Sequence, residues 1–173
     1  MYIAKITLTL MTAVLLGTTP TLTMAQECNP NMVKTKPDTR YVYNAAGDWV
    51  TDTATGLTWK RCVEGMHWTG ETCEGRFINT TWNGALEKAA AQPGWRLPNV
   101  KELESLLEGA CYDNSINEKA FPGTPGIADA WSATPVVRID YLAWAVDFGG
   151  GRPSWGDKLD YNYYHSVRLV RGP

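Results

Sequence analysis

The stretch Gly94-Trp95-Arg96-Leu97-Pro98-Asn99-Val100-Lys101-Glu102-Leu103 predicts an extended segment that leads directly into a capped helix. Pro98 has a fixed φ and biases the residue before it toward extended backbone. Asn99 can accept hydrogen bonds from the free amides of a helix start, and Glu102, three residues later, completes a capping box. We therefore expect a helix over residues 100–108, a structural feature and not a catalytic one. Its buried face consists of Val100, Leu103, Leu106 and Leu107.

The first 25 residues have the parts of a secretory signal peptide. Lys5 supplies a positive charge, residues 6–16 are mostly apolar, and Thr23-Met24-Ala25 places small residues where signal peptidase cleaves. The apolar run is shorter than the roughly 20 residues that span a bilayer. We therefore expect residues 1–25 to be removed, no membrane span, and an exported protein in the periplasm or at the cell surface.

Composition predicts one domain with short elements. The chain has 16 Gly and 10 Pro, which favour many turns. Its formal net charge is −2 and no basic run stands out, which disfavours nucleic acid and anionic membranes as partners. We expect an N-terminal arm over residues 26–44 and a single domain over residues 45–173.

The four cysteines of an exported chain predict two disulfides, for which three connectivities are possible. Cys62 and Cys73 flank a polar segment with turn residues, so they suit a local bridge. That pairing leaves Cys28 to join the N-terminal arm to Cys111. A zinc site is the alternative, but the sequence has no C-x₂-C pair and its two histidines are isolated. We expect no metal and no cofactor.

Hydrophobic alternation and turn residues predict an α+β domain with two early helices, small sheets, long loops and its termini close together. Thr80 or Thr81 is the expected cap of the first helix, and Gly56 can take the positive φ of a hairpin turn. Residues 149–162 are expected to form a loop. The expected strands are 40–43, 49–52, 57–60, 130–132, 142–148 and 165–170, and the first helix is 82–91.

Motifs over residues 45 to 171 resemble, in order, the Lcl C-terminal domain family. They include Asp52-Thr53-Ala54-Thr55-Gly56-Leu57-Thr58-Trp59, Gly94-Trp95-Arg96-Leu97-Pro98 and Ala143-Trp144-Ala145-Val146-Asp147-Phe148. The resemblance implies a bacterial exported domain with a C-type lectin-like fold. Relatives of known function mostly bind ligands at cell surfaces, including sulfated glycosaminoglycans. This chain lacks the collagen-like stalk of the adhesin that gives the family its name, and its mild negative charge disfavours a polyanion.

The candidate binding site lies in the connection between the strands that end at Phe148 and begin at His165. This connection is about three times longer than a hairpin requires, and long loops on a rigid scaffold commonly carry binding groups. Its aromatic rings suit sugar stacking, and its charged groups suit anions and hydroxyls. A packed surface loop is the alternative. The candidate ligand-binding residues are Arg152, Trp155, Asp157, Asp160, Tyr161 and Tyr163.

Two other sets of residues have plainer interpretations. Of the eight tryptophans, we expect Trp59, Trp82, Trp95, Trp131 and Trp144 in the core, and Trp68 in the Cys62–Cys73 loop. Asp147, Asp157 and Asp160 are of the type that coordinates calcium, but the Glu-Pro-Asn and Trp-Asn-Asp motifs of calcium-dependent lectins are absent.

The expected function is therefore ligand binding without catalysis, with a glycan or another cell-surface ligand as the partner. The sequence has no Gly-x-Ser-x-Gly elbow and no nucleotide-binding glycine loop. Asp147 and His165 could pair with a serine, but nothing positions one. The alternatives are a structural or pilus-like accessory subunit and an unrecognised hydrolase.

Overall fold

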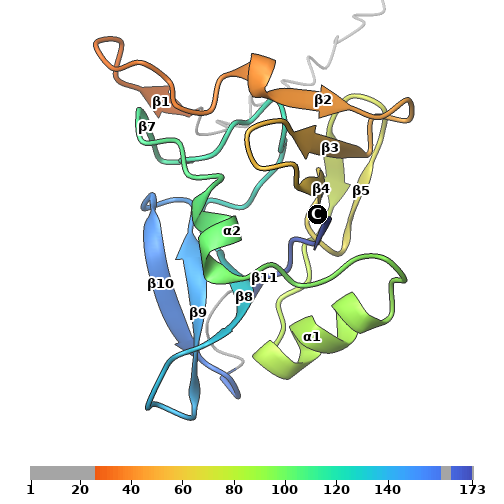
Figure 1. Cartoon of the computed structure of the whole chain (residues 1–173), viewed down its shortest axis with the longest axis vertical. Coiled ribbons are helices and arrows are strands. Elements are labelled where there is room, and N and C mark those ends of the chain that lie inside the picture. Colours follow the sequence, from red (N-terminus) through yellow and green to blue (C-terminus); the bar gives the residue numbers. More distant parts are fainter. Residues whose placement is uncertain (1–25, 161–164, 173) are drawn as a thin grey trace, which may run out of the picture.

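The computed structural model describes residues 26–160 and 165–172, and the expected signal peptide lies outside them (Figure 1). The described chain contains strands, two α-helices and a short 3-10 turn, η1. In order they are β1 (Glu27–Cys28), η1 (Asp38–Arg40), β2 (Tyr41–Tyr43), β3 (Trp49–Asp52), β4 (Thr58–Lys60), β5 (Met66–Trp68), β6 (Cys73–Gly75), α1 (Trp82–Ala90), α2 (Val100–Glu104), β7 (Cys111–Tyr112), β8 (Asp129–Pro135), β9 (Leu142–Asp147), β10 (Arg152–Asp157), β11 (His165–Ser166) and β12 (Val170–Arg171).

Within these residues the strands form two four-stranded sheets and two two-stranded ribbons. The sheets have the strand orders β10-β9-β8-β11 and β12-β4-β3-β2, and the ribbons are β1-β7 and β5-β6. The β11–β8 pair is parallel and the other pairs are antiparallel. The expected α+β class with two helices and small antiparallel sheets is confirmed. Neither helix of the described chain is long and apolar enough to cross a membrane.

The expected hairpin of β3 and β4 is confirmed. Gly56 has φ +73°, and its amide donates to the carbonyl of Asp52 at 2.8 Å, which closes the turn. The hydroxyls of Thr51 and Thr58 lie 2.9 Å apart across the two strands. The turn therefore fixes the register in which β4 meets β3.

Both helices begin where the sequence predicts. Thr81 accepts a hydrogen bond from the amide of Gly84, and Asn99 and Glu102 form the complete capping box of α2. The second helix ends at Glu104 and not at residue 108, so that part of the prediction was wrong. Beyond Glu104 the amides of Leu106 and Leu107 donate to carbonyls three residues earlier, as in a 3-10 helix. Leu106 is buried in the core.

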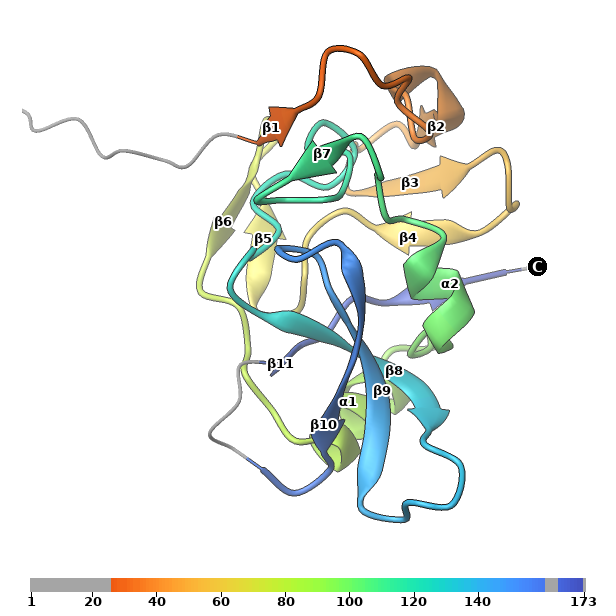
Figure 2. The same cartoon turned by 90° about the vertical axis from the view of Figure 1, so that its left-hand side faces the viewer.

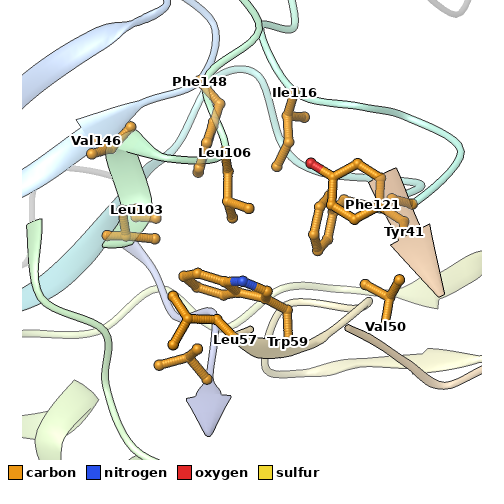
Figure 3. Close-up of a cluster of buried hydrophobic side chains, with 13 residues drawn as sticks. Tyr41, Val50, Leu57, Trp59, Leu103, Leu106, Ile116, Phe121, Val146 and Phe148 are labelled. Atoms are coloured by element: carbon orange, nitrogen blue, oxygen red, sulfur yellow. The ribbon is translucent and has the colours of Figure 1, made fainter. Parts of the chain in front are cut away.

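The α2 helix lies between the two four-stranded sheets, as both views show (Figures 1 and 2). Its residues Leu103 and Leu106 are fully buried and face Trp59 of β4 (Figure 3). On the other side of the same cluster, Tyr41 meets the edge of Phe121 with ring centroids 5.5 Å apart. One core therefore joins strands from both sheets.

The α1 helix covers the other face of the sheet β10-β9-β8-β11. Ala85 and Ala89 of α1 pack in a second cluster with Trp131, Val167 and Leu169. In β9 the side chains of Ala143 and Ala145 lie in this cluster, whereas Val146 lies in the cluster beneath α2. The expected alternation along residues 142–148 is therefore confirmed, and both faces of the strand are buried.

Two predicted segments need correction. Residues 149–162 were expected to form a loop, but β10 pairs along β9 from Arg152 opposite Asp147 to Asp157 opposite Leu142. Pro153 is tolerated because β10 is an edge strand. The expected strand 165–170 is divided into β11 and β12, because the chain passes from one sheet to the other between them.

Arg168 lies within that crossing and is fully buried. Its guanidinium donates to the carbonyls of Lys60 and Arg61 at 2.9 and 2.6 Å and to the hydroxyl of Thr124 at 2.7 Å. Burial lowers its pKa to about 9. The side chain thereby ties the C-terminal segment to β4 and to the loop before β8.

Both expected disulfides, Cys28–Cys111 and Cys62–Cys73, are confirmed. The first lies in the β1–β7 ribbon, where the two cysteines are directly opposed. The N-terminal arm is also held by Glu108, whose buried carboxylate accepts hydrogen bonds from the amides of residues 35 and 36. The arm continues into β2, which forms one edge of the sheet β12-β4-β3-β2, and β12 forms the other edge.

Three carboxylates, Asp52, Glu102 and Glu108, have pKa values below their ordinary values. Burial, the largest influence on each, raises the pKa, but hydrogen bonds to the charged form together outweigh it. Asp52 accepts from the guanidinium of Arg40, Glu102 accepts from that of Arg96, and Glu108 accepts from backbone amides.

The substitution Leu103→Ala should lower the free energy of unfolding by about 2–5 kcal/mol, because it leaves a cavity between the two sheets. The matched control is Lys101→Ala in the same helix, whose side chain is 81% exposed. The control should change stability by less than about 0.5 kcal/mol. Urea unfolding followed by tryptophan fluorescence measures both. Equal effects would contradict the position of α2.

Acid should destabilise the protein. The folded-state pKa values of Asp52, Glu102 and Glu108 lie below the unfolded-state values. The unfolded chain therefore binds more protons as the pH falls. Their contribution to the free energy of unfolding is complete above about pH 5 and is lost as the pH falls through the folded-state pKa values. Asp52→Asn should be less stable at pH 7 and should lose less stability between pH 5 and 2 than wild type. An unchanged pH dependence in urea unfolding would exclude this role for Asp52.

Candidate functional site

The structure distributes three of the six predicted binding residues over both faces of one strand. Arg152, Trp155 and Asp157 belong to β10, and because side chains alternate along a strand, Arg152 points away from the face that carries the other two. Trp155 is 62% exposed and meets the edge of Trp144 with centroids 6.4 Å apart. Tyr161 and Tyr163 lie outside the described residues. Binding by these residues stays a prediction.

The aspartates of this region stabilise turns. Asp147 accepts from the amide of Gly150 at 2.7 Å, and Asp157 accepts from the amide of Leu159 at 2.9 Å. The backbone amide of Asp160 donates to the carbonyl of Asp157. Over residues 26–160 and 165–172, no three His, Cys, Asp or Glu side chains are grouped so that they could hold a metal ion.

A different site lies on the outer face of the sheet β12-β4-β3-β2. A pocket of about 330 Å³ opens there, and three of its walls are the indoles of Trp49, Trp68 and Trp95. We call it the tryptophan pocket. Its charged lining residues are Asp48, Lys60, Glu64 and Arg171.

Strand alternation explains why these side chains reach the outer face. Val50 and Trp59 point into the core from β3 and β4, so their neighbours Trp49 and Lys60, which are directly paired, point outward. Val170 of β12 is likewise buried, and the next residue, Arg171, points outward. Three adjacent strands thus provide the floor of the pocket.

Trp95 reaches the pocket through a backbone pairing outside the strands. The amide of Arg96 donates to the carbonyl of Val170 at 2.9 Å, and the amide of Val170 donates back at 3.0 Å. Since this pairing is antiparallel, it places Trp95 opposite Arg171. The guanidinium of Arg171 lies over the rings of both Trp49 and Trp95, at 4.4 and 4.7 Å from their centroids.

The polar groups at the rim bind one another. The ammonium of Lys60 lies 3.1 Å from a carboxylate oxygen of Glu64 and also donates to Gln92. The amide of Gln92 donates to the second carboxylate oxygen of Glu64 at 2.8 Å. On the other side, Asp48 accepts from the side-chain amide of Asn44 at 2.6 Å. These groups are therefore held in fixed positions.

Trp68 belongs to the β5–β6 ribbon, which stands beside β4 in both views (Figures 1 and 2). The Cys62–Cys73 disulfide joins this ribbon to the end of β4. The indole nitrogen donates to the carbonyl of Ala46 at 3.1 Å, and the guanidinium of Arg61 lies 3.7 Å from the ring centroid. Gly47 has φ +74°, and a Cβ there would lie 3.1 Å from the indole nitrogen, so a larger residue would strain the backbone and crowd the indole.

The tryptophan predictions had mixed outcomes. Trp59 and Trp131 are fully buried, as expected. Trp95, expected in the core, is half-buried at the edge of the α1 cluster. Trp82 and Trp144 are also half-buried. Trp49 was not identified as a site residue, although its position next to the apolar Val50 in a strand was a usable signal.

A wider groove of about 910 Å³ runs along residues 113–127 and 147–150. Its lining contains no aromatic side chain and includes the acidic residues Asp113, Glu118 and Asp147. It therefore lacks the stacking surfaces that distinguish the tryptophan pocket.

Comparison with known proteins gives one match. The family model described as the Lcl C-terminal domain matches residues 48–171, a range that includes every residue of the tryptophan pocket. No curated protein matches the chain, and no solved structure matches it.

The partial burial of Trp95 predicts a moderate stability effect. Trp95→Ala should lower the free energy of unfolding by about 1–3 kcal/mol, because only part of the ring is removed from water. Trp59→Ala, at a site with 0% exposure, should cost about 3–5 kcal/mol. Urea unfolding of both variants checks the order. If Trp95→Ala cost as much as Trp59→Ala, Trp95 would belong to the core.

Proposed function

The chain belongs to the Lcl C-terminal domain family, and from this membership and the tryptophan pocket we propose that it is an exported bacterial domain that binds a glycan without catalysing a reaction. We propose that the domain has a C-type lectin-like fold. Its two disulfides are compatible with an oxidising compartment, which supports a location in the periplasm or at the cell surface.

The observation that carries this proposal is the composition and rigidity of the pocket. Ligand pockets typically combine aromatic walls with a few fixed polar groups, and the pocket has three indoles together with the polar groups of Asp48 and Glu64. Indole faces can pack against the C–H faces of a pyranose, and carboxylates can accept hydrogen bonds from its hydroxyls. Since the walls are held by strands, a disulfide and hydrogen bonds, little entropy is lost on binding.

The contacts of the two carboxylates in the pocket support ligand binding over glycoside hydrolysis. Hydrolysis uses two carboxyl groups, one of which donates a proton to the leaving oxygen. In the pocket, Glu64 is occupied by Lys60 and Gln92, and Asp48 accepts from Asn44. In the proposed function, these carboxylates therefore act as fixed hydrogen-bond acceptors.

An accessory-subunit function is the second candidate, and the exposed end of the sheet β10-β9-β8-β11 favours it. Tyr141 and Trp155 are each 62% exposed, and Leu159 is 70% exposed. Trp155 lies on β10 and the other two lie beside it, and β10 is an edge strand to which another chain could add a strand. In that case the ligand would be a protein that binds at β10.

A glycan array followed by calorimetry on the mature chain, residues 26–173, tests the proposal. Trp68→Ala should weaken binding of the glycan found on the array at least ten-fold, because it removes one stacking wall. The matched control is Trp155→Ala, which removes an exposed tryptophan on β10. It should bind like wild type. Circular dichroism of both variants confirms that they are folded.

The reverse result, lost binding in Trp155→Ala and wild-type binding in Trp68→Ala, would move the site to β10. An array without any bound glycan, together with a protein that copurifies and depends on Trp155, would favour the accessory subunit.

A further inference from the structure

Arg171 differs from the other half-buried and buried arginines in what its side chain binds. Arg40 pairs with Asp52, and Arg61 and Arg168 each donate to backbone carbonyls. Among the residues that the structure describes, the guanidinium of Arg171 has no hydrogen-bond acceptor and no ion-pair partner. Its contacts are the faces of Trp49 and Trp95.

This arrangement leaves the donors of Arg171 available. Contact with an aromatic face uses the π-surface of the guanidinium, whereas its N–H groups lie in the guanidinium plane. The two indoles, 4.4 and 4.7 Å from the guanidinium carbon, restrict the movement of that plane. A planar fork of donors matches a carboxylate, which it can bind through two parallel hydrogen bonds. The cation is therefore arranged to receive an oxyanion inside the pocket.

The charges around Arg171 limit the ligand to a small total charge. Lys60 and Glu64 neutralise each other across 3.1 Å, so Arg171 and Asp48 are the remaining charged lining residues. A ligand with one negative group can pair with Arg171 and direct hydroxyls toward Asp48. A chain with several sulfates would bring further negative charge to Asp48, and the protein itself has a formal net charge of −2.

We infer that Arg171 anchors a carboxylate, so that the tryptophan pocket selects a sugar unit with one carboxylate, a uronic acid, over neutral sugars and over sugars with several sulfates. This inference rests on the proposed glycan-binding function. The pocket volume of about 330 Å³ is at the lower end for ligand sites, which fits a terminal sugar unit better than a segment of a chain. In this arrangement the carboxylate meets the edge of Arg171, and the ring lies against the indoles.

The test compares three matched oligosaccharides by calorimetry on the mature chain. One ends in a uronic acid, the second in the corresponding neutral hexose, and the third in that hexose carrying several sulfates. Wild type should bind the uronic acid at least ten-fold more tightly than the neutral sugar, because charge-assisted bidentate hydrogen bonds add to the stacking. It should bind the sulfated sugar at least ten-fold more weakly than the uronic acid, because the further sulfates bring negative charge to Asp48.

Variants assign this preference to Arg171. Arg171→Gln should abolish it, so that the uronic acid and the neutral sugar bind equally, and Arg171→Lys should retain only a small part of it, since an ammonium does not form the bidentate pair. The control Arg138→Gln, at an exposed arginine in the loop between β8 and β9, should keep the full preference.

The outcomes separate this inference from the proposal on which it rests. Equal binding of the uronic acid and the neutral sugar would overturn the carboxylate anchor and leave the proposed glycan binding in place. Tighter binding of the sulfated sugar would overturn the choice of a carboxylate. Failure of all three sugars, in a protein shown to be folded, would overturn both. The comparison of sugars on wild type stands even if an Arg171 variant does not fold.

Discussion

Two hydrogen bonds between the backbones of Arg96 and Val170 connect the core of the domain with its candidate site. They join the segment before α2 to β12, at N–O distances of 2.9 and 3.0 Å. Val170 is at the same time paired with Trp59 and buried in the core between the sheets. Because the pairing is antiparallel, it also sets Trp95 against Arg171 on the outer face. A displacement of this segment would therefore alter the entry of α2, the core and the pocket together.

Features that depend on nearby residues could be predicted from the sequence. The capping box of Asn99 and Glu102, the turn at Gly56 and the start of α1 at Thr81 are each determined within a few residues. The end of α2 was mispredicted because the spacing of Leu106 and Leu107 fits a continued α-helix, whereas their amides donate to carbonyls three residues earlier. Strand β10 was missed because the three glycines before it and its own proline are typical of a loop, and only its place at the edge of a sheet makes the proline acceptable.

The candidate site could not be assembled from the sequence. Trp49, Trp95 and Arg171 are separated by 46 and 76 positions, and no motif relates them. They meet because β12 pairs with β4 and because Arg96 pairs with Val170, and both pairings are long-range. A sequence pattern identifies tryptophans and strands, but it does not distinguish an indole on the inner face of a sheet from one that turns outward at the edge of a core. The family match, in contrast, required only the order of the motifs.

The buried crossing at Arg168 has a consequence for the order in which the domain folds. Residues 167–170 supply Val167 and Leu169 to one hydrophobic cluster and Val170 to the other, and Arg168 satisfies carbonyls at the end of β4. A chain made from its N-terminus therefore cannot complete either cluster until these residues have been synthesised. Contacts between segments so distant in sequence also form slowly. A polypeptide that stays unfolded until its last strand is available remains suited to passage through a translocation channel, as the proposed export requires.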